Sequence, residues 1–232
     1  MQRRQFLHTS LAGALLCATA QHAWALSLGD LSHADASSGV KAALGQGAEA
    51  AVALLGRTDG FLGNSQVRIG LPGYLQDAAK VLKSMGQGRR VDELVTAMNR
   101  AAEEAVPMGK DLLVKAVQNM TVTDAKNILM GGNTSVTAFF AEKTRLPLGE
   151  RFLPVVNQAT EKVGLTQKYN AVAGKAAGFG LLKPEEANLA QYVTGKTLDG
   201  LYFMIGEEER RIRQDPAGAG SAIVRKVFGT LR

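Results

Sequence analysis

The stretch VDELVTAMNRAAEEAV (residues 91–106) shows most directly how this chain folds. When successive residues are placed about 100° apart, as in an α-helix, its apolar side chains fall within about 60° of one line. These side chains are Val91, Leu94, Val95, Met98, Ala102, Ala105 and Val106. The acidic side chains Asp92 and Glu93 lie outside that stripe. The stretch therefore predicts a helix with one buried face and one solvent-exposed face.

Helix signals continue on both sides of this stretch, and no run of alternating apolar and polar residues predicts a strand. The first helix would be capped by Asp35 or Ser37, Pro147 would start a later one, and a break is expected near Gly195. Residues 57–72 are rich in Gly and Asn, which is typical of a loop. The further helices are expected over 37–55, 73–85, 111–120, 123–131, 133–143, 147–163, 166–177, 184–213 and 221–228. The sequence thus predicts one all-α domain of roughly nine helices.

The N-terminus has the three regions of a secretory signal. Arg3 and Arg4 precede an uncharged, Ala-rich stretch, and Ala23 and Ala25 form the small-x-small pattern after which signal peptidase cleaves. The arginine pair, followed by Gln-Phe-Leu, resembles the twin-arginine export signal, although general secretion also fits. We therefore expect residues 1–25 to be removed after Ala25 and the remaining chain to be periplasmic.

The remaining chain, residues 26–232, would contain no Cys and no Trp, and its one His would be His33. A cysteine nucleophile, a disulfide and a zinc site built from Cys and His are thereby excluded. The whole chain has 27 Lys and Arg against 21 Asp and Glu; because the signal holds two of the arginines and no acid, the mature excess is +4. These cations are dispersed rather than arranged in a basic stripe, which argues against a nucleic-acid partner. We expect no cofactor, no metal and no transmembrane segment in the mature chain, and the oligomeric state is left open.

Several segments identify a known family. They are DASSGVKAAL (35–44), AVALLGRTDGFLGNSQVRIGLP (51–72), MNRAAEEAVP (98–107), MTVTDAKNILMGG (120–132), YVTGKTLDGLY (192–202) and GEEERRIRQDP (206–216). In this order they resemble the bacterial domain of unknown function 4197, from about residue 28 to residue 229. The family usually has Pro where Gly70 stands and Asn where Asp215 stands. The resemblance implies an exported helical protein and brings no agreed activity, substrate or cofactor.

Polar side chains of the loop 57–72 and of the helix 91–106 are candidates for a binding surface. On the helix, Asn99 and Glu103 flank the apolar stripe, while Arg100 points away from it. The resemblance covers the whole loop, and loops specified this closely are more often functional than helix faces. The candidate residues are Asp59, Asn64, Arg68, Asn99, Arg100 and Glu103. The alternative is that these groups only satisfy one another and hold the loop against the helix.

A second polar feature lies near the C-terminus, where Glu209 falls inside an apolar helical stripe. A buried carboxylate needs a partner to be tolerated. Arg213 lies four residues later, about one helical turn away, and is expected to form a structural ion pair with Glu209.

Three classes of function remain. The leading one is a non-enzymatic binding or interaction protein of the cell envelope, whose partner is an envelope protein or a small apolar ligand. A second is a hydrolase or lyase that uses carboxylates among Asp59, Glu103, Asp124 and Asp199, which would require two of them close together in a pocket. The third is a lipid-binding or apolar-ligand-binding envelope protein, which predicts an apolar cavity or a large exposed apolar patch.

Overall fold

The computed structural model of the chain describes residues 33–132, 134–162, 166–178 and 187–229. The helices are joined in places by short helical turns, one π-helical (Lys83–Gln87) and two of the 3-10 type (Val106–Gly109 and Ala217–Ala219). The described residues contain no strand, which confirms the all-α prediction. The α-helices are α1 (His33–Leu55), α2 (Gly73–Leu82), α3 (Gly88–Ala105), α4 (Lys110–Gln118), α5 (Val122–Met130), α6 (Ser135–Glu161), α7 (Thr166–Gly178), α8 (Leu189–Gln214) and α9 (Ala222–Gly229).

The number of separate helices is lower than the sequence predicts. Helical turns join α2, α3 and α4 without a loop between residues 73 and 118, although Gly86 in the first of these turns has a non-helical backbone and reverses the chain. The two helices expected over 133–143 and 147–163 are a single helix, α6. The described part of the chain therefore forms seven continuous helical segments, and the prediction of roughly nine is wrong.

Helix α6 continues through two prolines, at positions 147 and 154. A proline inside a helix costs about 3 kcal/mol, because it removes a hydrogen bond and crowds the preceding turn. Along α6 every fourth residue is buried, in the series Val136, Phe140, Thr144, Leu148, Phe152, Val156 and Thr160. This continuous buried ridge gains more from packing than the prolines cost, so Pro147 does not start a new helix. The same holds at Gly195, where α8 runs unbroken between buried Val193 and Leu198.

The N-terminal cap expected for the first helix is also wrong. Asp35 and Ser37 both lie inside α1, which already includes His33. Asp35 instead forms an ion pair with Lys226 of α9, at 2.9 Å. Its carboxylate thus connects the two helices rather than capping one of them.

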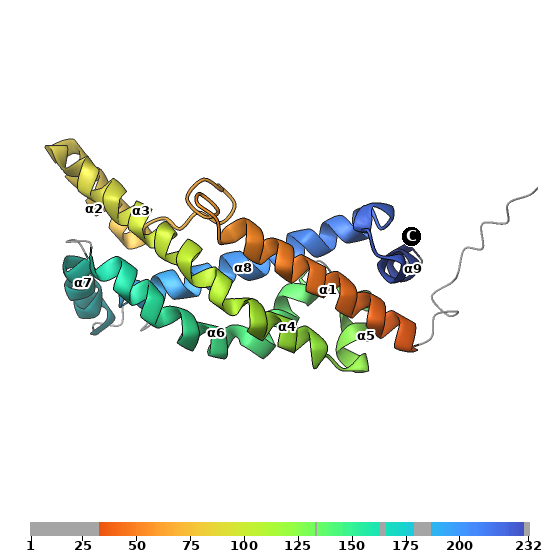
Figure 1. Cartoon of the computed structure of the whole chain (residues 1–232). Coiled ribbons are helices and arrows are strands. Elements are labelled where there is room, and N and C mark those ends of the chain that lie inside the picture. The colour runs from red at the N-terminus through yellow and green to blue at the C-terminus, as the bar shows by residue number, and fades with distance from the viewer. Residues whose placement is uncertain (1–32, 133, 163–165, 179–186, 230–232) are drawn as a thin grey trace, which may run out of the picture.

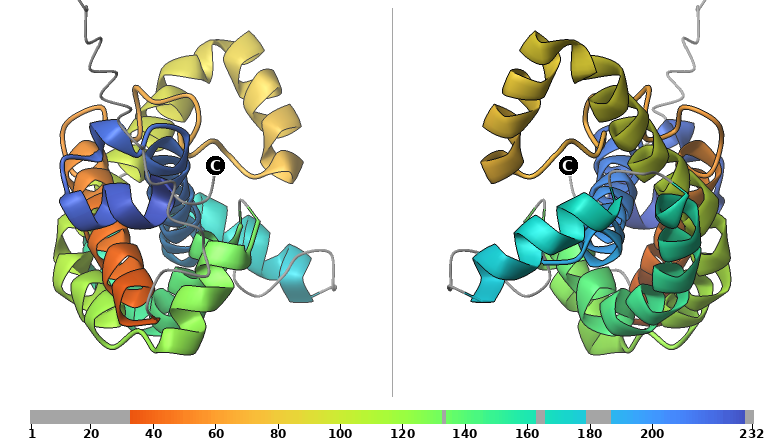
Figure 2. Two further views of the ribbon diagram at one scale, coloured as in Figure 1. Left: turned by 90° about the vertical axis from the view of Figure 1, so that its right-hand side faces the viewer. Right: turned by 90° about the vertical axis from the view of Figure 1, so that its left-hand side faces the viewer.

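Helix α8 lies at the centre of the group of helices, with α6, α1 and α3 packed along it (Figure 1). Helix α1 also packs on α4, α5 and α9, so the first helix contacts the last. Helices α2 and α3 form a hairpin that projects beyond the other helices (Figures 1 and 2). Within the described ranges, no helix is long and apolar enough to cross a bilayer.

Candidate functional site

The loop between α1 and α2 is fastened to α3 by three side chains, Asn99, Arg100 and Glu103, which we call the loop clamp. Glu103 is only 5% exposed, and its Oε1 accepts hydrogen bonds from the backbone N–H groups of Phe61 and Leu62, each at 3.0 Å. Its other oxygen, Oε2, accepts from Arg100 at 2.6 Å. The buried carboxylate is therefore satisfied by two backbone donors and one guanidinium.

Asn99 holds the far end of the same loop. This side chain is fully buried; its Oδ1 accepts from the backbone N–H of Ile69, and its Nδ2 donates to the carbonyl of Ile69, both at 2.8 Å. The amide thus replaces the backbone partner that a strand would give Ile69. A second donor contact of Nδ2, to the carbonyl of Val95, completes its hydrogen bonding.

Arg100 extends the clamp to Asp59, whose Oδ1 accepts from the guanidinium at 2.7 Å. The hydrogen bond to Glu103, and after it the one to Asp59, raise the pKa of Arg100 above its ordinary value. Asp59 adopts a positive φ of 64°, a conformation that Asp tolerates better than most residues. Arg100 is thus the link between the start of the loop and α3.

The two remaining loop candidates do not join the clamp. The Oδ1 of Asn64 accepts from the backbone N–H of Gln66 at 3.1 Å, and its Nδ2 donates to the sulfur of Met204 on α8 at 4.0 Å. Arg68 is exposed, and its side chain makes no hydrogen bond or ion pair with the part of the chain that the structure describes. The structure therefore brings Asp59, Asn99, Arg100 and Glu103 together and leaves Arg68 outside.

Apolar packing reinforces the clamp from the other side of the loop. Phe61 is fully buried, and Val67 and Ile69 are almost so. Gly200 of α8 makes this possible, because a Cβ at that position would lie 2.9 Å from the ring of Phe61. The loop is consequently held between α3 and α8, and its polar groups are engaged in fixing it.

The four carboxylates considered for acid–base chemistry do not form one site. Asp59 and Glu103 share Arg100, whereas Asp124 belongs to the capping box of α5. The backbone hydrogen bond from Thr121 lowers the pKa of Asp124, which keeps that group ionised. Asp199 of α8 pairs with Arg145 of α6 at 2.8 Å. Over the described ranges, no group of three or more His, Cys, Asp or Glu is placed to hold a metal ion.

Glu209 and Arg213 form an ion pair where α8 packs against α5 and α9. Glu209 is 3% exposed; burial raises its pKa, and the neighbouring charge of Arg213 opposes that rise. Arg213 also donates to the carbonyl of Ile128 at 2.6 Å, and its guanidinium lies 5.5 Å from the ring centre of Phe228. One arginine thus ties the C-terminal end of α5 and helix α9 to α8.

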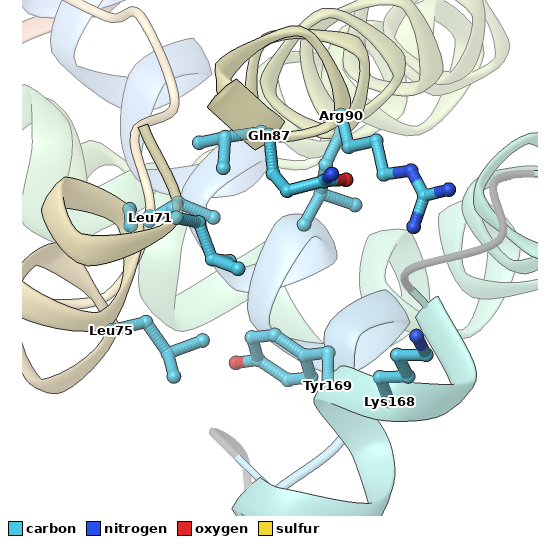
Figure 3. A pocket seen from close by; sticks show the side chains of 10 residues that line it. Leu71, Leu75, Gln87, Arg90, Lys168 and Tyr169 are labelled. Atoms are coloured by element: carbon cyan, nitrogen blue, oxygen red, sulfur yellow. The ribbon is translucent and has the colours of Figure 1, made fainter. Parts of the chain in front are cut away.

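An apolar cavity of about 360 Å³, which the sequence reasoning missed, lies between α2, α3 and α7 (Figure 3). We call it the α2–α3–α7 cavity. Tyr169 of α7 lies across from Leu71 and Leu75 (Figure 3). The lining residues are Leu71, Leu75, Ala79, Leu82, Gln87, Arg90, Val91, Leu94, Lys168 and Tyr169. The spacing of the leucines and alanine from 71 to 82 is helical, and this apolar stripe was the signal available in the sequence.

Two cations, Arg90 of α3 and Lys168 of α7, are the charged residues of this lining. Their charged ends lie on the same side of the opening (Figure 3). Both residues are exposed, and neither forms a hydrogen bond or an ion pair with the residues that the structure describes. The cavity therefore combines an apolar interior with two cations for which the described part of the chain supplies no anionic partner.

Comparison with known proteins gives a family and no characterised relative. No curated protein and no solved structure matches the chain. A family model described as "Protein of unknown function (DUF4197)" matches residues 30–229, almost the whole chain, and confirms the resemblance seen in the sequence. The chain is therefore a member of the DUF4197 family.

Proposed function

We propose that this protein is a non-enzymatic binding protein for an amphiphile that has one apolar chain and one anionic head group. The observation that carries the proposal is the α2–α3–α7 cavity, whose interior is apolar and whose charged lining residues are both cations. This arrangement favours the apolar-ligand alternative among the three classes of function. The dispersed carboxylates give the hydrolase or lyase alternative no comparable support.

The size of the cavity suits an alkyl chain. A cavity of roughly 150 Å³ lined by apolar side chains is large enough to bind benzene, and this one has about 360 Å³. Small-molecule sites generally occupy roughly 300–1,000 Å³, so the volume lies within the usual range. Each methylene transferred from water into such a site gains about 0.8 kcal/mol. Two added methylenes should therefore tighten Kd roughly tenfold, until the cavity is full.

The charges at the opening define the head group. The planar guanidinium of Arg90 can donate two parallel hydrogen bonds to a carboxylate or phosphate, and Lys168 adds a point charge. Because neither cation is paired with a residue that the structure describes, a bound anion would not have to displace any of these residues. An uncharged chain of equal length should bind less tightly.

Calorimetric titration with alkyl carboxylates of increasing length, and with the matching alkyl alcohols, tests this function. We expect Kd to fall with each added pair of methylenes and the carboxylates to bind more tightly than the alcohols. Arg90→Ala and Lys168→Ala should each weaken carboxylate binding about tenfold and leave alcohol binding unchanged. Leu75→Asp should weaken both series, because it places a carboxylate in the apolar interior.

The matched control is Arg89→Ala. Arg89 is adjacent to Arg90 in the sequence but pairs with Glu93 and does not line the cavity. This variant should bind both series like the parent protein. Binding that does not depend on chain length, or an equal loss in the Arg89 and Arg90 variants, would contradict the proposed function.

We also propose that the protein works in the periplasm, after cleavage of residues 1–25 and with residues 26–232 as one domain. The support is the sequence of the signal, which lies outside the described residues. Replacing Arg3 and Arg4 together by Lys should leave the precursor in the cytoplasm if export uses the twin-arginine route. Immunoblotting of cell fractions measures where the variant is located. Normal export of the variant would indicate general secretion instead.

A further inference from the structure

The free end of the α2–α3 hairpin, residues 80–90, is a second surface that bears on function, and we call it the hairpin tip. It projects away from the remaining helices in all three ribbon views (Figures 1 and 2). None of the residues of its π-helical turn, Lys83–Gln87, is buried. The chain reverses there at Gly86, which has a positive φ of 76°.

The hairpin tip exposes two large apolar side chains to solvent. Val81 is 57% exposed and Met85 is 69% exposed. They are four residues apart, about one helical turn, so they share one side of the tip. Met is flexible and adapts to irregular apolar surroundings.

Cations outnumber acids around these two side chains. Residues 80–90 (KVLKSMGQGRR) contain four cations and no acid. Lys83 and Arg89 pair with Asp92 and Glu93 farther along α3, but all four groups are more than half exposed. Exposed pairs of this kind contribute about 0–1 kcal/mol, so they can exchange for lipid phosphates at little cost.

The hairpin tip is also continuous with the cavity. Leu82, Gln87 and Arg90 belong to the tip and line the α2–α3–α7 cavity. An amphiphile that enters or leaves the cavity beside these residues therefore passes next to the exposed apolar side chains.

We propose that the hairpin tip docks on a bilayer that contains anionic phospholipid, with Val81 and Met85 inserted at the level of the head groups. Apolar residues flanked by Lys and Arg are the combination that holds a segment in the interface of an anionic membrane, where each cation contributes about 1 kcal/mol. The purpose, exchange of the amphiphile between bilayer and cavity, rests on the proposed function; the docking itself can be measured independently of it.

The test is co-sedimentation of the full chain with vesicles of phosphatidylcholine alone, or of phosphatidylcholine mixed with phosphatidylglycerol. We expect binding to the mixed vesicles, weaker binding at high salt, and little binding to phosphatidylcholine alone. Val81→Asp and Met85→Asp should each reduce the bound fraction about tenfold, because each removes an inserted apolar group and adds a repelled charge.

Met130→Asp is the matched control, since Met130 is 81% exposed but lies at the end of α5. It should bind vesicles like the parent chain. Equal sedimentation of the Met85 variant and the parent, or an equal loss in the Met130 variant, would overturn the docking. So would a change from dimer to monomer in the Met85 variant on size-exclusion chromatography, because the tip would then contact a second copy.

Titration with alkyl carboxylates in the absence of vesicles separates the two proposals. The Met85 variant should bind these ligands like the parent chain, since Met85 does not line the cavity. Vesicle binding without carboxylate binding would leave the docking standing and refute the proposed function. Carboxylate binding without vesicle binding would leave the proposed function standing and refute the docking.

Discussion

Replacing Glu103 by Ala is the sharpest test of how the loop clamp works. The substitution removes the acceptor of three hydrogen bonds, from the backbone N–H groups of Phe61 and Leu62 and from the guanidinium of Arg100. It leaves the helix intact, because Ala is the best helix former. Any loss of stability therefore measures the attachment of the loop to α3.

The expected size of the effect follows from the burial of the three donors. Phe61 is fully buried, so its N–H would be left without a partner at a cost of about 1–3 kcal/mol. Leu62 is only partly buried, so its N–H can recover some hydration. The side chain of Arg100 is 39% exposed and keeps Asp59 as a partner. We therefore expect a total loss of about 2–4 kcal/mol, which lowers Tm by roughly 2–4 °C for each kcal/mol in a chain of this length.

Urea unfolding followed by far-ultraviolet circular dichroism measures this loss. Glu103→Gln is the conservative comparison, because its carbonyl oxygen can still accept from the two backbone donors; it should cost about half as much or less. Glu104→Ala is the control on the same helix, since Glu104 is exposed; it should stay within about 0.5 kcal/mol of the parent.

A loss in Glu103→Ala no larger than in Glu104→Ala would refute the structural account of the clamp. The polar groups of the loop and α3 would then be free to serve as a binding surface. In that case Arg100→Ala should leave Tm unchanged and abolish capture of a partner from an envelope extract.

Three further predictions concern stability. Burial raises the pKa of Glu209 above its ordinary value of 4.5, so the folded state holds the proton at a higher pH than the unfolded state does. The free energy of unfolding should therefore fall as the pH rises above 4.5. Urea unfolding at a series of pH values should show that this fall is absent in Glu209→Gln. The pKa of Asp124 is lowered by its capping hydrogen bonds, so Asp124→Asn should cost about 1 kcal/mol at neutral pH and progressively less as the pH falls below 3.8, where the parent loses the same stabilisation. Gly200→Ala should destabilise by about 1–3 kcal/mol through its clash with Phe61, whereas Gly195→Ala on the same helix, with open space around it, should be neutral or stabilising by thermal melting.

Much of the fold could be predicted from local sequence, because helix period and helix ends depend on residues close along the chain. The stripe of residues 91–106 predicts α3, and its polar members were expected to lie near the loop 57–72. Family membership could also be predicted from short segments that occur along the chain in the family's order. The end expected for the first helix at residue 55 agrees with the end of α1 at Leu55.

Other features depend on contacts that no local pattern contains. Helix α6 crosses Pro147 because a ridge of side chains finds partners on α8 and α3, and those partners come from elsewhere in the chain. The hydrogen bonds of Asn99 to Ile69 likewise require a loop 30 residues away to arrive in one register.

The cavity shows most clearly which features the sequence determines and which depend on tertiary packing. The sequence by itself determines that the chain is helical, that it belongs to the DUF4197 family and that residues 71–82 carry an apolar stripe. Only the tertiary structure decides that this stripe faces α3 and α7 without filling the space between them, and that Arg90 and Lys168 lie on the same side of the cavity. The physical reason is that helix formation is a local process, whereas a cavity is the volume left over when distant helices pack.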